Sequence, residues 1–483
     1  MAAAYTNMRI RIFKRDDQTG LYAAEANSDS GASYQDQLRL DLSKLLGLQY
    51  SPREYGLELF YTLFSGRLRR AYDVVSGQAV AETDGRLRVR LQIDDAAPEL
   101  HGLRWETLYH TYRGAELPLA ISADTPFSRY NALESAEAKP LTPPLQLLFA
   151  LANPSDLAGS GLAPLDVEAE IRSLLAALAD LRENGKLQVK IMPGRTGLTP
   201  ALQAELDSAG WQILPGVTSL ENVARALPGC NIFHFLGHGA YSQSGEQAAL
   251  VLEREDENKQ GESKRVPDQT LASRLRPLSD LRLVFLAACE SARRDTDRQE
   301  PNPYVGLAPQ LVQAGVPAVV AMQDEVEMGA ARQLTGQFYG QLLDHGYVDQ
   351  ALNMARYTLF SDDDKQWTIP VLYMRLADGR LFAPEADSPT DESAGATQPA
   401  TKHASISHQL MIELRDILAK RFSIEDLKQL VFDMGIDYED LPGQIRAAKA
   451  RELVAYCQRR GLIPKLIEVG QHQRPDINWP LIA

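Results

Sequence analysis

The sequence predicts an α/β protein with a mainly parallel sheet flanked by helices, a mixed α/β region before it and a small helical bundle after it. Three patterns predict this fold. Apolar strands alternate with amphipathic helices through the middle of the chain, a strictly alternating strand precedes them, and helical spacing dominates the end. A chain of 483 residues is long enough for about three domains. We expect a scaffold region at 1–140, the central domain at 141–383, a linker at 384–404 and the helical domain at 405–483.

The first region carries signals of both strands and helices but no recognisable chemistry. Residues 8–13 and 38–42 alternate weakly between apolar and polar side chains, which favours strands, whereas 52–64 has apolar side chains at helical spacing. Residues 86–93 (RLRVRLQI) alternate strictly, as in a strand that is half-buried. We interpret this region as a scaffold or a platform for substrate.

The central region carries the α/β alternation. Continuously apolar runs are typical of strands that parallel sheets bury on both faces, and apolar side chains at helical spacing mark the helices between them. The predicted strands are 145–152, 187–192, 231–236, 282–287 and 318–322, and the predicted helices are 167–183, 269–275 and 305–314.

The end of the chain differs in composition from the rest. Residues 384–404 are rich in Pro, Ser, Thr and Ala, which predicts a flexible linker. Beyond the linker, Ser423 is placed as the N-cap of a helix with Asp426 three residues later, and Phe422 and Leu427 are placed as a hydrophobic staple. These signals predict an independent helical domain.

Composition and charge argue against several classes of protein. The formal net charge of −14 disfavours nucleic acid as the main partner, because phosphate binding requires a basic face. Cys230, Cys289 and Cys457 are far apart in the sequence, which excludes a disulfide framework, argues against a cysteine zinc site and fits a reducing compartment. We find no signal-peptide pattern and no apolar run of membrane-spanning length. We therefore expect a soluble, cytoplasmic protein.

Two strands of the central region end at residue types that catalysis uses. His238 follows the strand in NIFHFLGHG, between Gly237 and Gly239, and Cys289 follows the strand in LRLVFLAACES. Ligands of parallel sheets bind at the carboxyl ends of the strands. A right-handed helical crossover between the two strands would make them parallel neighbours. We therefore expect His238 and Cys289 to meet at one edge of the sheet.

An imidazole next to a thiol makes the thiol a useful nucleophile. It lowers the pKa of the thiol or takes its proton during attack, and it then protonates the leaving amine. The amides of Gly239 and Cys289 are candidates for stabilising the developing oxyanion. Glu290 and Ser291 either orient the cysteine loop beside substrate or cap the next segment, and His234, within its strand, is expected in the core.

Five short motifs lie along about residues 86–382. They are Leu103-Arg-Trp105-Glu106-Thr-Leu, Phe235-x-Gly-His-Gly, Ala288-Cys289-Glu290-Ser291, Ala314-Gly-Val-Pro-Ala-Val-Val-Ala321 and Trp367-x-x-Pro-Val-Leu-Tyr373. Together they resemble the CHAT family of caspase-like cysteine peptidases, relatives of caspases and separase. The resemblance implies a caspase-like sheet and hydrolysis of peptide bonds in proteins. It also implies His238 as the general base, Cys289 as the nucleophile, and neither a metal nor a cofactor.

One position departs from the family pattern. Many members have an aromatic or apolar residue at the second position after the 318–322 strand, whereas this chain has Asp324. In separase-like relatives an acidic residue just after that strand lines the primary specificity pocket. The resemblance therefore implies that Asp324 selects Arg or Lys before the scissile bond through a charge-assisted pair. The alternative is an acidic side chain in a solvated loop.

Residues 242–268 form a long, polar and charged segment. We interpret the segment as a mobile surface loop. The alternative is a gating or processing loop over the active site, because long loops in compact domains are often functional.

The last domain carries a second set of motifs. They are Leu414-Arg-Asp-Ile, Phe422-Ser-x-Glu-Asp-Leu427, Asp437-Tyr-Glu-Asp-Leu-Pro-Gly443, Lys449-Ala-Arg-Glu-Leu-Val454, Arg459-Arg-Gly461 and Arg474-Pro-Asp476. They resemble the death-like, effector-associated domains of bacterial conflict systems, which implies a partner protein that carries a like domain. The acidic cluster of Asp437, Glu439 and Asp440 and the basic cluster of Lys449, Arg451, Arg459 and Arg460 either favour head-to-tail pairing or are ordinary solvated helix faces.

Three hypotheses follow from these patterns. The first is a cysteine endopeptidase that cleaves protein substrates after Arg or Lys as the effector of a bacterial defence or programmed cell-death system, recruited or activated through its last domain. The second is a catalytically silent caspase-like scaffold or adaptor, against which the intact His238 and Cys289 motifs argue. The third is another cysteine–histidine enzyme, such as an amidase or a transferase. None of the three requires direct binding of nucleic acid or a membrane.

Overall fold

The computed structural model describes most of the first 383 residues and parts of the last domain. The described residues are 5–112, 115–130, 139–140, 143–160, 162–241, 248–287, 303–324, 326–362, 365–383, 414–415, 417–418, 421–434, 449–450, 453–454, 457, 462–475, 477 and 479–480. The chain forms two compact units, Met1–Ser388 and Pro389–Ala483.

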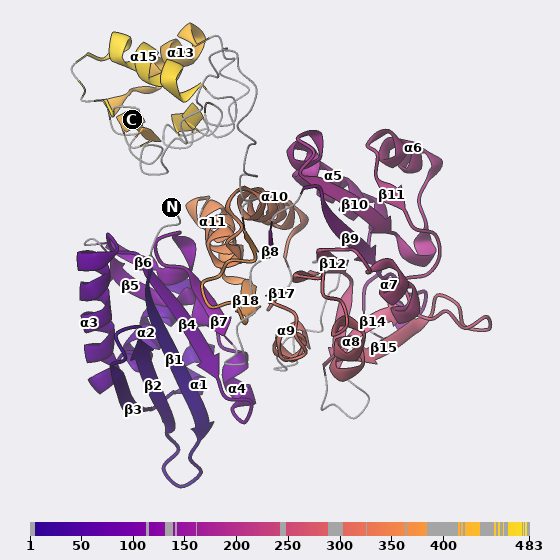
Figure 1. Cartoon of the computed structure of the whole chain (residues 1–483), viewed down its shortest axis with the longest axis horizontal. Coiled ribbons are helices and arrows are strands. Elements are labelled where there is room, and N and C mark those ends of the chain that lie inside the picture. Colours follow the sequence, from indigo (N-terminus) through magenta and orange to yellow (C-terminus); the bar gives the residue numbers. More distant parts are fainter. Residues whose placement is uncertain are drawn as a thin grey trace, which may run out of the picture. The chain divides into compact units, whose positions relative to one another are not determined.

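A twelve-stranded sheet runs through the first unit (Figure 1). Its strands are β1 Thr6–Arg15, β2 Tyr22–Ser28, β3 Ser33–Leu38, β4 Leu87–Ile93, β7 Phe127–Tyr130, β9 Leu145–Leu151, β10 Leu187–Met192, β11 Gln212–Ile213, β12 Ile232–Leu236, β16 Leu283–Ala287, β17 Ala318–Met322 and β18 Pro370–Met374. Their order across the sheet is β11-β10-β9-β12-β16-β17-β18-β7-β4-β1-β2-β3. The pairs β17–β18, β1–β2 and β2–β3 are antiparallel and the other neighbours are parallel. The predicted mainly parallel sheet is confirmed.

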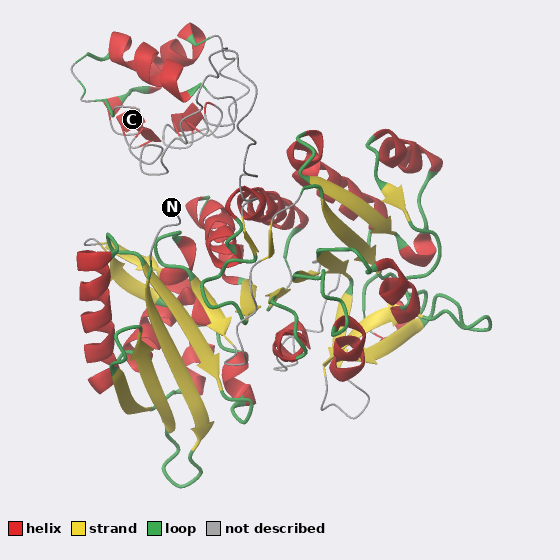
Figure 2. Cartoon of the chain, in the orientation of Figure 1, coloured by secondary structure: helices red, strands yellow, loops and turns green. Residues whose placement is uncertain are grey.

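Helices cover both faces of the central strands of this sheet (Figure 2). They are α1 Leu42–Gly47, α2 Pro52–Leu63, α3 Gly66–Glu82, α4 Pro98–His101, α5 Val167–Glu183, α6 Pro200–Ser208, α7 Leu220–Ala226, α8 Asp268–Leu275, α9 Pro303–Gln313, α10 Met328–His345 and α11 Val348–Ser361. One core joins α5, α10 and α11 to one face of the central strands, and a second core joins α7, α8 and α9 to the other face. Every predicted strand and helix of the central region is present within two residues of its expected bounds.

The N-terminal strands form a third core with α2 and α3. The predicted strand at 8–13 and the predicted helix at 52–64 are confirmed by β1 and α2. The predicted strand at 38–42 is wrong, because β3 ends at Leu38 and α1 begins at Leu42. The Asp41 side chain accepts the Lys44 N–H at 2.9 Å and caps α1, which favours a helix start over a continued strand.

The prediction that residues 86–93 form a strand is correct, but both faces of β4 are buried. β4 lies inside the sheet between β7 and β1. Arg88 and Arg90, the expected solvent-facing residues, are only 3% and 2% exposed. Arg88 is held by a buried ion pair, with its Nε 2.7 Å from Asp349 Oδ2 at the start of α11. The alternation therefore reflects a face of buried charge and not a solvated face.

Part of the segment expected to be a loop at 242–268 forms strands. β13 His238–Tyr241, β14 Ala248–Glu253 and β15 Ser263–Pro267 make an antiparallel three-stranded sheet. β14 (AALVLE) is buried throughout because its apolar side chains join the core beneath α8 and α9. The loop interpretation of 242–268 is therefore wrong for β14 and β15, since the short apolar run of β14 lies beside a longer charged stretch.

The sheet continues across the expected boundary at residue 140. β7 pairs with β18 through Arg129 and Tyr373, and short two-stranded pairs join β5 Tyr109–Tyr112 to β6 Ala115–Pro118 and β8 Lys139–Pro140 to β19 Phe382–Ala383. The division at residue 140 therefore separates two parts of one compact unit. It remains a proposal about the organisation of the sequence.

The second unit contains helices around a small core of its own. Its longer described helices are α13 Ile424–Asp433 and α15 Ile463–Gln473. The predicted capping box of Ser423 and Asp426 is present, and both residues of the predicted staple, Phe422 and Leu427, are buried. Lys449 is only 8% exposed, so it is not a solvent-facing member of the expected basic cluster. The other residues of the two charged clusters lie outside the described residues.

Candidate active site

The carboxyl ends of β12 and β16 lie side by side. The two strands pair in parallel from the first residue of each to the last, and neighbouring strands are about 4.8 Å apart. His238 and Cys289 each come two positions after the end of one of these strands. The predicted adjacency of the strands is confirmed, whereas Cys289, Glu290 and Ser291 lie outside the described residues.

His238 is the first residue of β13 and only 2% exposed. Its Nε2 lies 2.8 Å from the carbonyl oxygen of Ala163. A carbonyl oxygen only accepts hydrogen bonds, so Nε2 carries the proton. Burial lowers the pKa of His238, while the bond to Ala163 acts in the opposite direction. The imidazole is therefore neutral at neutral pH, and Nδ1 is its basic nitrogen.

The two glycines beside His238 have different surroundings. A Cβ atom at Gly237 would lie 2.5 Å from the Phe235 ring, so only glycine lets the chain pass this close to the aromatic core. Gly239 continues into β13 opposite Leu250 of β14. The glycine at 237 is therefore required by packing against the Phe235 ring.

Glu253, at the end of β14, organises the loops near His238. Its side chain is fully buried and accepts three backbone hydrogen bonds, from the N–H groups of Asn153 at 3.0 Å, Arg195 at 2.9 Å and Thr218 at 2.7 Å. Burial raises the pKa of Glu253, and these three bonds lower it. One carboxyl group therefore joins the chain segments that follow β9 and β10 and the one that precedes α7.

Asn153 links this loop network to the segment that holds His238. Its Oδ1 accepts the Leu165 N–H at 3.0 Å and its Nδ2 donates to the Leu165 carbonyl at 3.2 Å. Leu165 is two residues from Ala163, whose carbonyl holds the imidazole. The sequence reasoning missed both Asn153 and Glu253. The available signal was an acidic residue closing the otherwise apolar run AALVLE.

His234 packs in the core, as predicted. Its ring stacks on Phe285 with centroids 4.5 Å apart, and its Nδ1 lies 3.1 Å from the Tyr339 hydroxyl. Burial lowers the pKa of His234 to about 3. This histidine therefore stays neutral at neutral pH and serves packing.

Asp324 lies just beyond β17, at the sheet edge where the parallel strands β12 and β16 also end. Its side chain is 55% exposed, and its Oδ2 lies 3.1 Å from Nη2 of Arg104. The carboxylate predicted to read a basic side chain thus already contacts a guanidinium of its own chain. Arg104 comes from one of the five motifs quoted above.

Glu106, from the same motif as Arg104, forms a buried ion pair near Asp324. Glu106 and Arg129 form two hydrogen bonds, Nε to Oε1 at 2.9 Å and Nη2 to Oε2 at 2.7 Å. Arg129 Nη2 also donates to Gln323 Oε1 at 3.3 Å. Gln323 directly precedes Asp324, so this pair helps to fix where the chain leaves β17.

Cys230 and Cys457 are buried, as expected of structural cysteines. Burial raises the pKa of both thiols, that of Cys457 to about 12. Neither thiol is therefore reactive at neutral pH.

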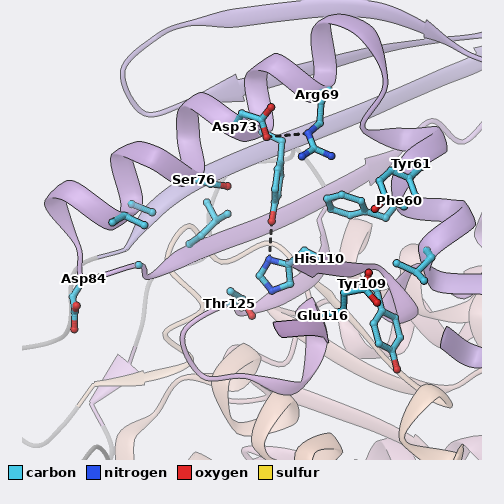
Figure 3. Close-up of a pocket in the computed structure, with 16 residues that line it drawn as sticks. Phe60, Tyr61, Arg69, Asp73, Ser76, Asp84, Tyr109, His110, Glu116 and Thr125 are labelled. Atoms are coloured by element: carbon cyan, nitrogen blue, oxygen red, sulfur yellow. Dashed lines mark hydrogen bonds and ion pairs between the residues drawn. The ribbon is translucent and has the colours of Figure 1, made fainter. Parts of the chain in front are cut away.

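A cavity of about 650 Å³ lies beneath α3 and contains none of the predicted site residues (Figure 3). The hydroxyl of Tyr72, a residue of α3, lies 2.7 Å from His110 Nδ1. Burial lowers the pKa of His110 to about 4, so the His110 side chain is uncharged at neutral pH. The cavity is separate from the candidate active site.

Neither a membrane span nor a metal cluster is found in the described part of the chain. Its helices are too short or too polar to cross a bilayer. Its His, Cys, Asp and Glu side chains form no group of three or more that could hold a metal ion.

Comparison with known proteins identifies two families. Residues 53–412 match the CHAT domain and residues 414–475 match effector-associated domain 7. Two structures of the Saccharomyces cerevisiae separase–securin complex match with 10% identity, covering 77% and 76% of this chain with TM-scores of 0.38 and 0.36. The chain spans 30% of the separase chain in each case. No curated protein matches the sequence. Because the first match covers well over half of the 483 residues, the chain belongs to the CHAT domain family and carries an effector-associated domain 7 after it.

Proposed function

We propose that the chain is a cysteine endopeptidase with His238 as the general base and Cys289 as the nucleophile. The observation that carries the proposal is the parallel pairing of β12 with β16, because it brings the residues that follow both strands to one edge of the sheet. The hydrogen bond from His238 Nε2 to Ala163 supports it, since it leaves Nδ1 as the atom that accepts a proton.

The proposed reaction proceeds through a thioester. Nδ1 of His238 takes the thiol proton of Cys289, the sulfur bonds to the substrate carbonyl carbon, and the carbonyl electron pair moves onto oxygen. The amides of Gly239 and Cys289 stabilise this oxyanion. The C–N bond then breaks as Nδ1–H protonates the leaving amine, and a water that gives a proton to Nδ1 hydrolyses the thioester.

Asp324 is proposed to select Arg or Lys before the scissile bond, and Glu290 and Ser291 to contact substrate. The ion pair of Asp324 with Arg104 supports the choice of a guanidinium, because the carboxylate already accepts one at 3.1 Å. A substrate arginine would replace Arg104 in this pair. Exposed ion pairs contribute little to stability, so the exchange costs little.

The effector-associated domain is proposed to recruit or activate the peptidase through a like domain on a sensor or adaptor protein. We propose that the chain acts in a bacterial defence or programmed cell-death system, in the cytoplasm, by limited cleavage of protein substrates. The match to effector-associated domain 7 supports this role, and the core of the second unit supplies a compact module for it.

The first measurement is alkylation of the full chain by iodoacetamide at neutral pH, which requires neither substrate nor activator. We expect one fast-reacting thiol per chain, absent in Cys289→Ala and at least about tenfold slower in His238→Ala, because the thiolate depends on the imidazole. Cys457→Ala is the matched control and should leave the fast reaction unchanged. Equal rates in wild type and His238→Ala would contradict the dyad.

A positional peptide library then tests specificity, with the partner of the last domain added where the free chain is inactive. Cleavage after Arg or Lys should require Cys289, weaken in Asp324→Asn and strengthen in Arg104→Gln, since the second change frees the carboxylate. Cys289-dependent cleavage after other residues would keep the peptidase and reject the role of Asp324. A catalytically silent scaffold would show no fast thiol and no cleavage with the partner present.

A further inference from the structure

One face of the N-terminal strands concentrates buried polar atoms that lack a partner. Among the described residues, eleven buried side-chain nitrogen and oxygen atoms have no hydrogen-bond partner, and five of them lie together on β1, β4 and β7. The five are Arg11 Nε, Arg88 Nη2, Arg90 Nε, Arg90 Nη1 and Ser128 Oγ. Buried polar groups are nearly always paired, so five such atoms in one place indicate a ligand.

The strand register puts these atoms on a single face. Arg90 pairs with Ser128 across β4 and β7, and Arg88 comes two residues earlier on β4. Arg11 pairs with Gln92, which is two residues after Arg90. Side chains two residues apart on a strand share a face, as do directly paired residues. The four side chains therefore share one face of the sheet, with Arg90 and Ser128 between Arg88 and Arg11.

This face carries more positive than negative charge. Arg88 Nε is 2.7 Å from Asp349 and Arg11 Nη2 is 3.8 Å from Asp94, whereas Arg90 donates from Nη2 to the neutral Asn7 Oδ1 at 2.7 Å. Burial, and then the charges of Arg88 and Arg9, lower the pKa of Arg90. A buried guanidinium without a counter-charge is unfavourable, and a bound anion would remove that cost.

A cavity adjoins the group. The Arg90 guanidinium lies 5.4 Å from the centroid of the Tyr130 ring. Tyr130 and Arg11 both line a cavity of about 390 Å³, a size that suits a small ligand. His101 also lines this cavity, and its Nδ1 is another buried atom without a partner. Arg11 thus opens directly onto this cavity and Arg90 adjoins it through Tyr130, while the carboxylates of Asp94 and Asp95 also line it.

We propose that this face binds an oxyanion, the carboxylate or phosphate group of a small ligand whose remainder lies in the cavity beside Tyr130. Arg90 and the hydroxyl of Ser128 donate hydrogen bonds to it, and the guanidinium groups of Arg88 and Arg11 lie on the same face on either side of them. Charged hydrogen bonds of this kind, formed out of water, are the strong ones in proteins. The site shares no residue with the proposed dyad, so its test does not depend on peptidase activity.

The test measures thermal unfolding of the full chain in phosphate, acetate and chloride at equal pH and ionic strength. Phosphate also stabilises proteins without binding, so every shift is compared with that of a variant. We expect phosphate or acetate to raise the Tm of wild type relative to chloride. Arg90→Gln should lose most of this shift, and isothermal titration should show binding weakened roughly ten- to a hundredfold. Arg274→Gln, which alters an exposed arginine on α8, away from this face, is the matched control and should keep the shift.

Each outcome decides the proposal. A shift with phosphate alone assigns a phosphate group, and a shift with acetate as well assigns oxyanions in general. Equal shifts in wild type and Arg90→Gln, or no shift with either anion, would overturn the site. If Arg90→Gln does not fold, Ser128→Ala removes only the hydroxyl and should weaken binding several-fold.

Discussion

Arg129 and Arg90 are buried arginines on the neighbouring strands β7 and β4, and they occupy opposite faces of one sheet. Arg129 donates to both carboxylate oxygens of Glu106, to the carbonyls of His101 and Leu103, and to the Tyr373 hydroxyl. Arg90 donates from one nitrogen to Asn7 and keeps two nitrogens without a partner.

The pKa values of the two arginines move in opposite directions. Glu106 beside Arg129 outweighs the effect of burial and raises the pKa of that guanidinium, whereas burial with Arg88 and Arg9 nearby lowers the pKa of Arg90. The protein itself supplies every partner on one face and leaves partners missing on the other. The first arrangement is typical of structure, and the second is typical of a binding site.

The largest expected effect is on the face where all partners are present. Glu106→Gln leaves Arg129 charged and buried without its carboxylate, and breaking a buried pair in this way costs roughly 3–5 kcal/mol. We expect the free energy of unfolding, measured by urea denaturation, to fall by that amount. Glu116→Gln, which breaks an exposed pair with Arg53, should change it by less than about 1 kcal/mol. If Glu106→Gln and Glu116→Gln lost the same free energy of unfolding, the buried Arg129–Glu106 pair would not be special, and the contrast between the two faces would fail.

The sequence predicts the central fold well because its signals there are strong. Buried parallel strands must be continuously apolar, and runs such as 145–152 and 318–322 have no other stable place. The ends of β12 and β16 follow from the same pattern, which is why the position of His238 could be predicted. The strand at 86–93 was recognised by its alternation, but alternation alone does not distinguish a solvated arginine from a buried one.

The parts that could not be predicted depend on contacts between distant residues. The three backbone partners of Glu253 lie 35, 58 and 100 residues away, so no local pattern reveals them. The pairing of Asp324 with Arg104 joins residues 220 apart in the sequence. The strand β14 was missed because the charged residues around it dominate the composition of that segment.

The second-largest expected effect comes from changing Glu253. Like Arg129, Glu253 is a buried charged group whose hydrogen-bond partners are all provided by the protein. Glu253→Gln keeps the shape but replaces one acceptor oxygen by an NH₂ group that faces backbone donors. We expect a loss of roughly 1–3 kcal/mol in the free energy of unfolding, since a buried donor loses its acceptor. Because the loop through Ala163 then shifts, the alkylation of Cys289 should also slow.

The matched control is Glu255→Gln, two residues further along the chain and exposed to solvent. Its side chain contacts only the Ser219 hydroxyl, at 3.1 Å, among the hydrogen bonds that the described residues show for it. It should leave both stability and thiol reactivity within about 0.5 kcal/mol and a factor of two of wild type. A normal alkylation rate in a destabilised Glu253→Gln would mean that the carboxyl group holds the fold but not His238.

The smallest expected effect is the one that most sharpens the comparison. Arg90→Met in chloride removes a buried charge without a counter-charge, together with its repulsion from Arg88 and Arg9, and it costs the bond to Asn7. Replacing buried ionic groups by apolar ones of similar size is often neutral or stabilising. We therefore expect the free energy of unfolding to change by less than about 1 kcal/mol, or to rise, whereas Arg129→Met should lose several kcal/mol in the same urea titration. If Arg90→Met were as destabilising as Arg129→Met, Arg90 would be a structural residue whose partners the protein provides, and the two faces would not differ.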